Sequence, residues 1–268
     1  GDEMTPTSIA KPGMVPMQTI TPKNRVPKVT VDFWLIKLMA VTMGETAADY
    51  LAVNLGFGLT ATSLIMAAVL IGALVLQFGQ KRYVPWSYWL AVVLISIVGT
   101  LVTDNLVDNF GVSLITTTIV FTLALAATFL LWFRTEGTLS IHSVFTTRRE
   151  AWYWLAILFT FALGTAAGDL VAEQFGLGYL STGILFGLII ASLAVGYFFL
   201  GPILGFWLAY IFTRPLGASF GDLLSQPAQY GGMGLGTIIT SALFLGAISM
   251  IVVWMSIASG VEEVPASN

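Results

Sequence analysis

Residues 33–49 read FWLIKLMAVTMGETAAD, and the spacing inside this stretch recurs three more times along the chain. Each copy begins with an aromatic residue, Trp and Leu, then has Gly ten residues after the Trp and Asp five residues after the Gly. The four sets are Trp34, Gly44 and Asp49; Trp89, Gly99 and Asp104; Trp154, Gly164 and Asp169; and Trp207, Gly217 and Asp222. Identical offsets in copies that are unequally spaced indicate internal repeats, so we expect a repeat architecture.

The composition is typical of a membrane protein. Of the 268 residues, 57% are hydrophobic and only 9% are charged, whereas soluble domains carry roughly 25% charged residues. The chain has no cysteine, which excludes disulfides, iron–sulfur clusters and thiolate metal sites. The net charge is −3 and no basic cluster occurs, so we expect no nucleic acid as a partner. The high hydrophobic content makes the lipid bilayer the expected partner.

The apolar segments are long enough to cross a membrane, which requires about 20 residues in a helix. We predict membrane-spanning helices at 31–53, 58–79, 86–109, 112–133, 152–174, 178–200, 203–225 and 234–258. They form four two-helix repeats at about 31–79, 86–133, 152–200 and 203–258. The expected fold is therefore an all-α integral membrane protein with a single eight-helix domain at 31–258. Residues 1–30, with five prolines, are expected to be a flexible cytoplasmic tail, and residues 259–268 a C-terminal tail.

A Gly-rich turn joins the two helices of each repeat. The first Gly of the turn comes seven residues after the Asp in three copies, at Gly56, Gly111 and Gly176. In the fourth copy it comes ten residues after the Asp, at Gly232, and the insertion contains Pro227. The fourth turn is thus expected to differ from the other three.

Lys and Arg residues indicate the orientation in the membrane. They occur in the N-terminal tail and in the loops between repeats, whereas the Gly-rich turns contain none. Positive loops face the cytoplasm, so both termini are predicted to be cytoplasmic, in a bacterial inner (plasma) membrane. All four repeats then enter the membrane in the same direction, as parallel repeats about the membrane normal. We expect each Trp at the cytoplasmic interface and each Asp about 22 Å deeper, at one shared level.

Within the predicted spans, every charged residue lies on the first helix of a repeat. Ionisable groups at membrane depth are costly and face the interior of a helix bundle or a wet cavity. The first helices of the four repeats should therefore line the centre, and the second helices should face lipid.

Acidic residues in these first helices form the candidate site. Glu45 and Asp49 are four residues apart and therefore lie on one helix face. The second and third copies also have two acids at this spacing, and the fourth has Asp222 with Gln226. The candidate cation-binding and metal-ligating residues are Glu45, Asp49, Asp104, Asp169 and Asp222. The auxiliary residues are Thr46, Thr100, Thr165, Ser219, Asp108, Glu173 and Arg214. Arg214 occurs in only one copy, so we expect it to pair with a central acid and make the site asymmetric.

The aromatic–Trp–Leu starts and the segment RPLGASFGD at 214–222 resemble a known group of bacterial membrane proteins. Proteins of this group are built from four tandem two-helix repeats, each with a tryptophan, and are described only as uncharacterised membrane-anchored proteins. The resemblance covers about residues 26–258. It implies an eight-helix inner-membrane protein and no particular activity.

The acids favour a cation transporter or exchanger. Carboxylates with Thr and Ser hydroxyls suit divalent metals such as manganese, magnesium or iron(II). Acids in a low-dielectric interior would exchange protons for the metal, so transport would be coupled to protons. The small inorganic cation and protons are the expected partners. A bound divalent metal ion is the one cofactor that the residues suggest, and no catalytic residue is expected.

Two alternatives remain open. Gly168-Asp169 and Gly221-Asp222 are similar to the Gly-Asp element of intramembrane aspartyl proteases, in which two acids share a proton, although the element's first Gly is missing. An organic-cation transporter or sensor is the other alternative, because 13% of the residues are aromatic and would supply cation–π contacts.

Overall fold

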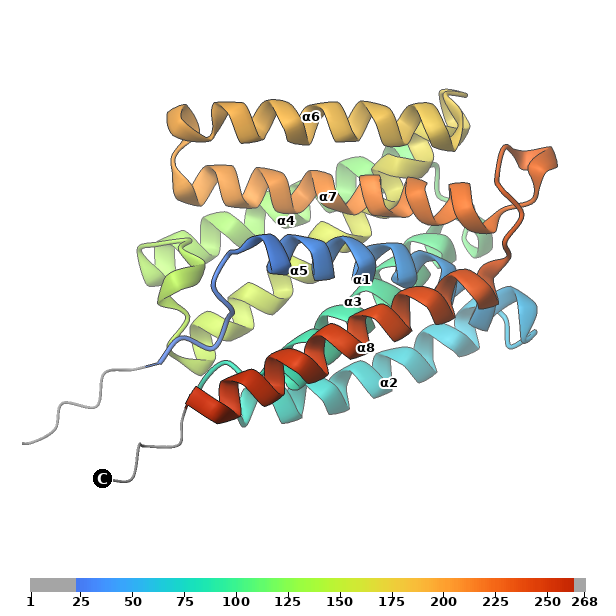
Figure 1. The fold of residues 1–268 in the computed structure, drawn as a ribbon. Helices are drawn as coiled ribbons and strands as arrows, with labels where there is room; N and C mark the ends of the chain where they lie inside the picture. Colours follow the sequence, from blue (N-terminus) through green and yellow to red (C-terminus); the bar gives the residue numbers. More distant parts are fainter. Residues whose placement is uncertain (1–22, 263–268) are drawn as a thin grey trace, which may run out of the picture.

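The computed structural model describes residues 23–262, and all regular secondary structure in this part of the chain is helical. The long helices are α1 Val31–Asp49, α2 Leu59–Phe78, α3 Pro85–Asp104, α4 Leu114–Glu136, α5 Thr147–Asp169, α6 Gly178–Leu200, α7 Pro202–Ser225 and α8 Thr237–Glu262 (Figure 1). The prediction of eight helices is confirmed. Their starts follow local signals: the Thr30 hydroxyl accepts a hydrogen bond from the Phe33 N–H, and prolines occupy the first turns of α3 and α7.

A π-helical turn follows the repeated Asp in three of the four copies. These turns are η1 Tyr50–Asn54, η2 Asn105–Asn109 and η4 Leu170–Gln174. In η1, the Leu55 N–H donates to the Tyr50 carbonyl at 3.0 Å, five residues back. The fourth copy has no such turn; α7 ends at Ser225, and a short 3₁₀ helix, Ala228–Tyr230, follows. The longer spacing from Asp to Gly in that copy is the sequence counterpart of this difference.

Four helices form the centre of the bundle. More than half of the residues in the apolar stretches of α3, α5 and α7 are buried, as are most residues of α1. The corresponding share is below a quarter in α2, α4, α6 and α8. The inner helices pack as a closed ring, α1 against α3, α3 against α5, α5 against α7 and α7 against α1.

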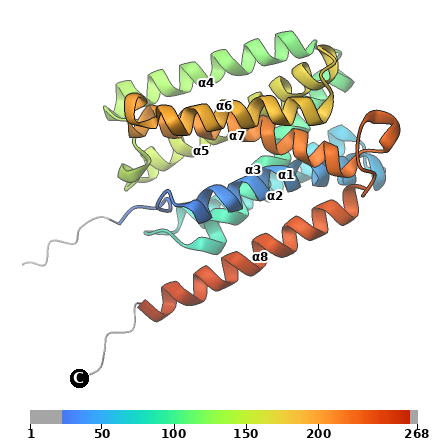
Figure 2. The ribbon, with the colours of Figure 1, turned by 45° about the horizontal axis from the view of Figure 1, so that its top comes forward.

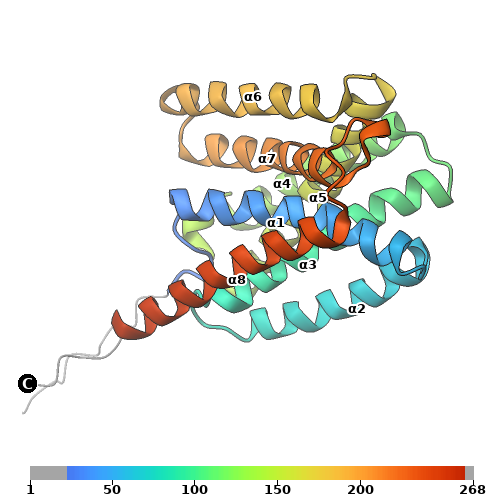
Figure 3. The same ribbon diagram turned by 45° about the vertical axis from the view of Figure 1, so that its right-hand side comes forward.

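The outer helices do not pack mainly on the inner helix of their own repeat. Instead α2 packs on α3, α4 on α5 and α6 on α7, and α8 returns to pack on α1 (Figure 1). Each outer helix therefore covers the first helix of the following repeat, and the contact between α8 and α1 closes the circle. The two helices of one repeat therefore pack mainly against helices of neighbouring repeats and not against each other. Figures 2 and 3 show that the first and last described residues lie at the same end of the bundle.

Seven of the eight long helices are long and apolar enough to cross a membrane, within residues 23–262. The exception is α1, where Asp32, Lys37, Glu45 and Asp49 fall within 19 residues. These charges lower the hydropathy of α1, although α1 packs against α3 and α7 in the ring of inner helices.

The described part of the N-terminal tail contacts the loops between repeats. The Asn24 side chain donates to the Ile141 carbonyl at 2.9 Å, and the Arg25 N–H donates to the Val144 carbonyl at 3.1 Å. Arg25 also forms a salt bridge of 2.7 Å with Glu150, which is buried. Within the predicted tail, Asn24 and Arg25 therefore pack against the loop before α5 and the start of α5. The rest of the expected tail, residues 1–22, lies outside the described residues.

Three of the four tryptophans of the repeat are buried, and the fourth, Trp34, is partly buried. Trp89, Trp154 and Trp207 are each at most 3% exposed. They belong to an aromatic layer that joins the N-terminal ends of the inner helices and consists of Phe33, Trp34, Tyr88, Trp89, Tyr153, Trp154, Phe206 and Trp207. Rings from neighbouring helices fill the space around these tryptophans, so the rings pack within the protein at one end of the bundle.

Candidate functional site

The repeated glycines lie where the inner helices cross. A Cβ added to Gly44 would overlap the Ser96 side chain of α3, and a Cβ on Gly99 would lie 2.9 Å from the Phe161 Cβ of α5. The other two glycines meet residues of the next inner helix in the same way: Gly164 meets Arg214, and Gly217 meets Val41. The absence of a side chain at these four positions therefore allows the close helix approach that the sequence suggested.

Arg214 lies at the centre of the ring and is fully buried. Its Nη2 donates to Glu45 Oε2 at 3.2 Å, to Thr165 Oγ1 at 2.9 Å and to Thr100 Oγ1. Its Nη1 donates to the Val41 carbonyl at 3.1 Å. One guanidinium thus joins α7 to all three other inner helices.

The partners of this guanidinium occupy equivalent places in the repeats. Glu45, Thr100 and Thr165 each lie eleven residues after the Trp of their copy. The residue at that place in the fourth copy is Ala218, on the same helix as Arg214. The Thr100 hydroxyl also donates to Glu45 Oε2 at 3.1 Å. The structure therefore brings together Arg214, Glu45 and the two threonines that the sequence proposed as auxiliary residues.

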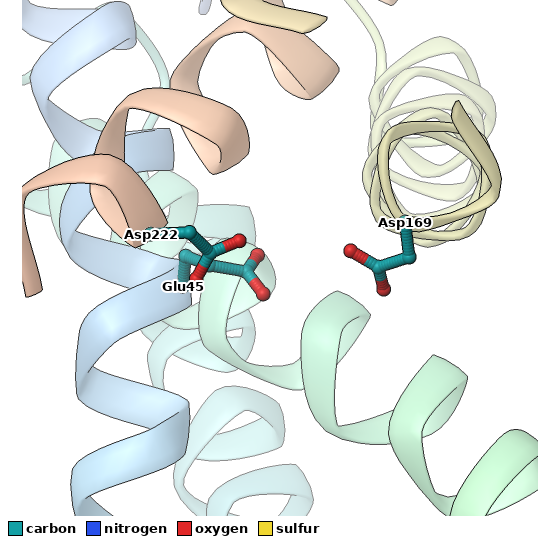
Figure 4. A group of neighbouring side chains, drawn as sticks. All are labelled: Glu45, Asp169 and Asp222. Carbon is teal, nitrogen blue, oxygen red and sulfur yellow. The ribbon is translucent and has the colours of Figure 1, made fainter. Parts of the chain in front are cut away.

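Three of the candidate acids form a compact group. One carboxylate oxygen each from Glu45, Asp169 and Asp222 lies within 4.8 Å of the other two. Figure 4 shows Glu45 and Asp222 side by side, with the Asp169 carboxylate directed toward them from α5. We call these three residues the acid triad. Oxygens that bind one cation at 2.0–2.6 Å lie up to about 4–5 Å apart, so this separation suits a shared ion.

The other two candidate acids lie beside the triad. Asp49 accepts a hydrogen bond from the Gln226 side chain at 3.3 Å. Asp104 is within electrostatic range of Glu45 and Asp169, as Asp49 is of Glu45, but neither completes the triad. The four repeated Asp residues thus converge on one region, and only two of them belong to the compact group.

Exposure increases along the inner helices from the triad toward the Gly-rich turns. Glu45 and Asp222 are buried, and Asp49, Asp104 and Asp169 are partly buried. The two auxiliary acids one turn further on, Asp108 and Glu173, are exposed. The acids therefore range from exposed residues at the turn end of the bundle to the buried Glu45 and Asp222.

Two expected auxiliary hydroxyls are directed elsewhere. Thr46 Oγ1 lies 2.7 Å from Ser241 Oγ on α8, and it also bonds to the Met43 carbonyl of its own helix. Ser219 is buried, and its Cβ faces Gly183 of α6. Both residues lie one position past the layer of Glu45 in their repeats, which turns them toward an outer helix.

Lys37, a further charged residue of α1, lies among aromatic side chains of other inner helices. Lys37 is fully buried, donates to the Tyr210 carbonyl at 2.6 Å and lies 3.8 Å from the centre of the Tyr210 ring. The Phe161 ring, at 5.7 Å, lies on another side of the ammonium. The signal available in the sequence was the shared place of Lys37 and Tyr210, three residues after the Trp of their copies.

In chemical terms the site is a set of oxygen ligands with one fixed positive charge. Three carboxylates supply anionic ligands, and Thr100 and Thr165 supply neutral oxygens beside them. The layers on the N-terminal side contain Arg214, then Lys37, then the aromatic layer. Carboxylate and hydroxyl oxygens at this spacing are the kind of ligands that suit a hard or borderline cation.

Comparison with known proteins identifies the repeats and no relative of known activity. Neither the curated proteins nor the solved structures contain a match to the chain. The family described as a repeat of unknown function, DUF347, matches at residues 33–83, 87–138, 152–201 and 205–260. These four segments agree with the repeats that the Trp–Gly–Asp spacing defines, and the chain therefore belongs to the DUF347 repeat family.

Proposed function

We propose that this protein is a multi-pass transporter or exchanger of a divalent cation, with the acid triad as its binding site. The observation that carries the proposal is the meeting of Glu45, Asp169 and Asp222 from three different inner helices, with carboxylate oxygens within 4.8 Å of one another, in a bundle of largely apolar helices. Burial of several acids is costly unless a cation or protons neutralise them. Manganese, magnesium and iron(II) are the candidate ions, because carboxylate and hydroxyl oxygens suit them.

The arrangement in the membrane is part of the proposal. We place the four repeats parallel to one another, about an axis along the membrane normal, with both termini in the cytoplasm. Arg82 lies in the loop between α2 and α3, and the last turn of α4 and the first turn of α5 contain Arg134, Arg148 and Arg149. This end would face the cytoplasm, in accordance with the positive-inside rule. The exposed acids Asp108 and Glu173 would then face the opposite side. A cation would enter from that side, and protons released from the acids would leave in exchange.

Transport assays in proteoliposomes test the proposal. The purified protein is reconstituted with an internal metal-sensitive dye, and Mn²⁺ entry is followed at a set pH gradient. We expect metal entry in the wild type and at least a tenfold loss in Glu45→Gln, Asp169→Asn and Asp222→Asn. The matched control is Asp32→Asn, which removes an exposed acid at the other end of α1 and should retain full activity. Unchanged entry in all three triad variants would refute the proposal.

A hydrolase is the second candidate, because Asp169 and Asp222 bring carboxylate oxygens from two helices to within 4.8 Å, and a closer approach would let them share a proton. The two functions differ in whether they require Glu45 and a metal ion. Cleavage of a membrane peptide by the reconstituted protein, lost in Asp169→Asn and retained in Glu45→Gln without any metal, would favour the hydrolase. Loss of metal transport in all three variants without cleavage would favour the transporter.

An organic-cation transporter has less support in the geometry. The aromatic face best placed to bind such a cation, that of Tyr210, is taken by the ammonium of Lys37. A thermal-shift screen of divalent metals against quaternary ammonium compounds distinguishes the two kinds of substrate. We expect stabilisation by the metals.

A further inference from the structure

Arg214 is a departure from the repeat that lies in direct contact with the proposed binding site. The residues seven positions after the Trp in the four copies are Val41, Ser96, Phe161 and Arg214. Three of them are neutral, and the fourth introduces a positive charge that is completely buried. The chain also provides space for this side chain, because Gly164 leaves room for its Cβ and Cγ.

The guanidinium sets the net charge of the site. The acid triad contributes three carboxylates, and Arg214, 3.2 Å from Glu45, leaves the four groups with a net charge of −2 when the acids are ionised. An arginine keeps its proton at any physiological pH, so this contribution does not vary. In a low-dielectric interior an uncompensated unit charge is costly. The site therefore favours a cation whose positive charge balances the negative charge of the site.

We infer that Arg214 is the specificity-determining residue of this site: it matches the triad to a divalent cation and holds Glu45 in position through their ion pair. This inference rests on the proposed function. It adds that selectivity for the charge of the ion depends on a residue that does not bind the ion itself. Loss of Arg214 would increase the affinity for a trivalent cation most. Loss of Glu45 would favour a cation of lower charge.

The test measures a ratio of affinities and not the activity alone. The full-length protein in lipid nanodiscs is titrated with Mn²⁺, with free Mn²⁺ measured by electron paramagnetic resonance, and then with La³⁺ in competition. The ratio of La³⁺ to Mn²⁺ affinity is compared among the wild type, Arg214→Gln, Glu45→Gln and the double variant. A general loss of packing would lower the affinity for both ions alike and leave the ratio of affinities unchanged.

We expect the ratio to rise on the order of tenfold in Arg214→Gln and to fall on the order of tenfold in Glu45→Gln, because each changes the site by one unit charge. In the double variant the net charge returns to −2, so the ratio should return to the wild-type value. The double variant also avoids the unpaired buried charge that would impair folding of Arg214→Gln. The control Arg134→Gln removes an exposed arginine and should have no effect.

The outcomes separate the two proposals. If the wild type binds neither ion, or if binding does not depend on Asp169 and Asp222, the proposed function fails and this inference fails with it. If the wild type binds Mn²⁺ through the triad but Glu45→Gln and the double variant keep the same ratio, only the inference is overturned. A ratio that follows the net charge through the whole series supports it.

Discussion

Replacement of Gly164 by Ala tests the close crossing of α5 and α7 in the ring. A Cβ at this position would overlap Cβ and Cγ of Arg214 and would lie 3.2 Å from the Pro215 Cδ. These atoms cannot move aside easily. Arg214 is fixed by bonds to three other helices, and the proline ring restricts the backbone next to it. The helices α5 and α7 would have to separate instead.

The size of the effect follows from two opposing contributions. Overpacking of a tight core costs about 1–3 kcal/mol, and we expect the upper end because the ion pair with Glu45 is disturbed as well. Alanine in place of glycine inside a helix returns about 0.5–1 kcal/mol. The net loss of about 2 kcal/mol corresponds to a midpoint of thermal unfolding that is lower by about 4–8 °C in a chain of this size.

Thermal unfolding of the purified protein in detergent measures this shift. The control is Gly72→Ala in the outer helix α2, where an added Cβ has no neighbour within 4 Å. The control should be as stable as the wild type or slightly more stable, since only the helix preference changes. A Gly164→Ala protein as stable as this control would show that α5 and α7 are not in close contact at Arg214, and the account of the ring would be refuted.

Three further predictions concern the fold. Arg25→Ala should lower the free energy of unfolding by about 3 kcal/mol, because Glu150 is left buried without its positive partner. In this cysteine-free chain, the pair Thr46→Cys and Ser241→Cys should form a disulfide on oxidation, detected as loss of maleimide labelling, because the two hydroxyls are 2.7 Å apart. Trp89→Ala should cost about 3–5 kcal/mol in thermal unfolding, because the ring is only 2% exposed.

Each of these has its own control. Arg25→Lys keeps the charge and should lose much less stability than the alanine variant. The single cysteine variants should remain labelled after oxidation, and a labelled double variant would contradict the packing of α8 on α1. Trp86 is 47% exposed, so Trp86→Ala should change stability little. Equal losses for Trp86 and Trp89 would contradict the buried aromatic layer.

Much of the fold could be predicted from the sequence because its signals are local. The segment predicted at 178–200 is α6 Gly178–Leu200, and the one predicted at 31–53 is α1 with its π-helical turn to Asn54. Hydropathy over a window of one helix decides such boundaries. The repeated Gly and Asp were likewise recognised from spacing alone, and both lie at the helix crossings or beside the triad.

The partners across the ring could not be predicted, because they depend on how far each helix is rotated and shifted against its neighbours. Thr46 and Thr100 are one position apart in the repeat, yet one contacts Ser241 on α8 and the other contacts Arg214. The tryptophans illustrate the same limit, since an amphipathic ring suits an interface as well as an aromatic layer.

The four repeats, the helices and the concentration of acids on the inner helices follow from the sequence alone, since each depends on residues within about 20 positions of one another. The tertiary structure alone decided that α8 covers α1, that Asp169 and Asp222 meet Glu45, and that Arg214 binds all three neighbouring helices. These contacts join residues up to 195 positions apart in the chain. They form because the four glycine crossings bring the inner helices close enough for one buried guanidinium to reach every repeat.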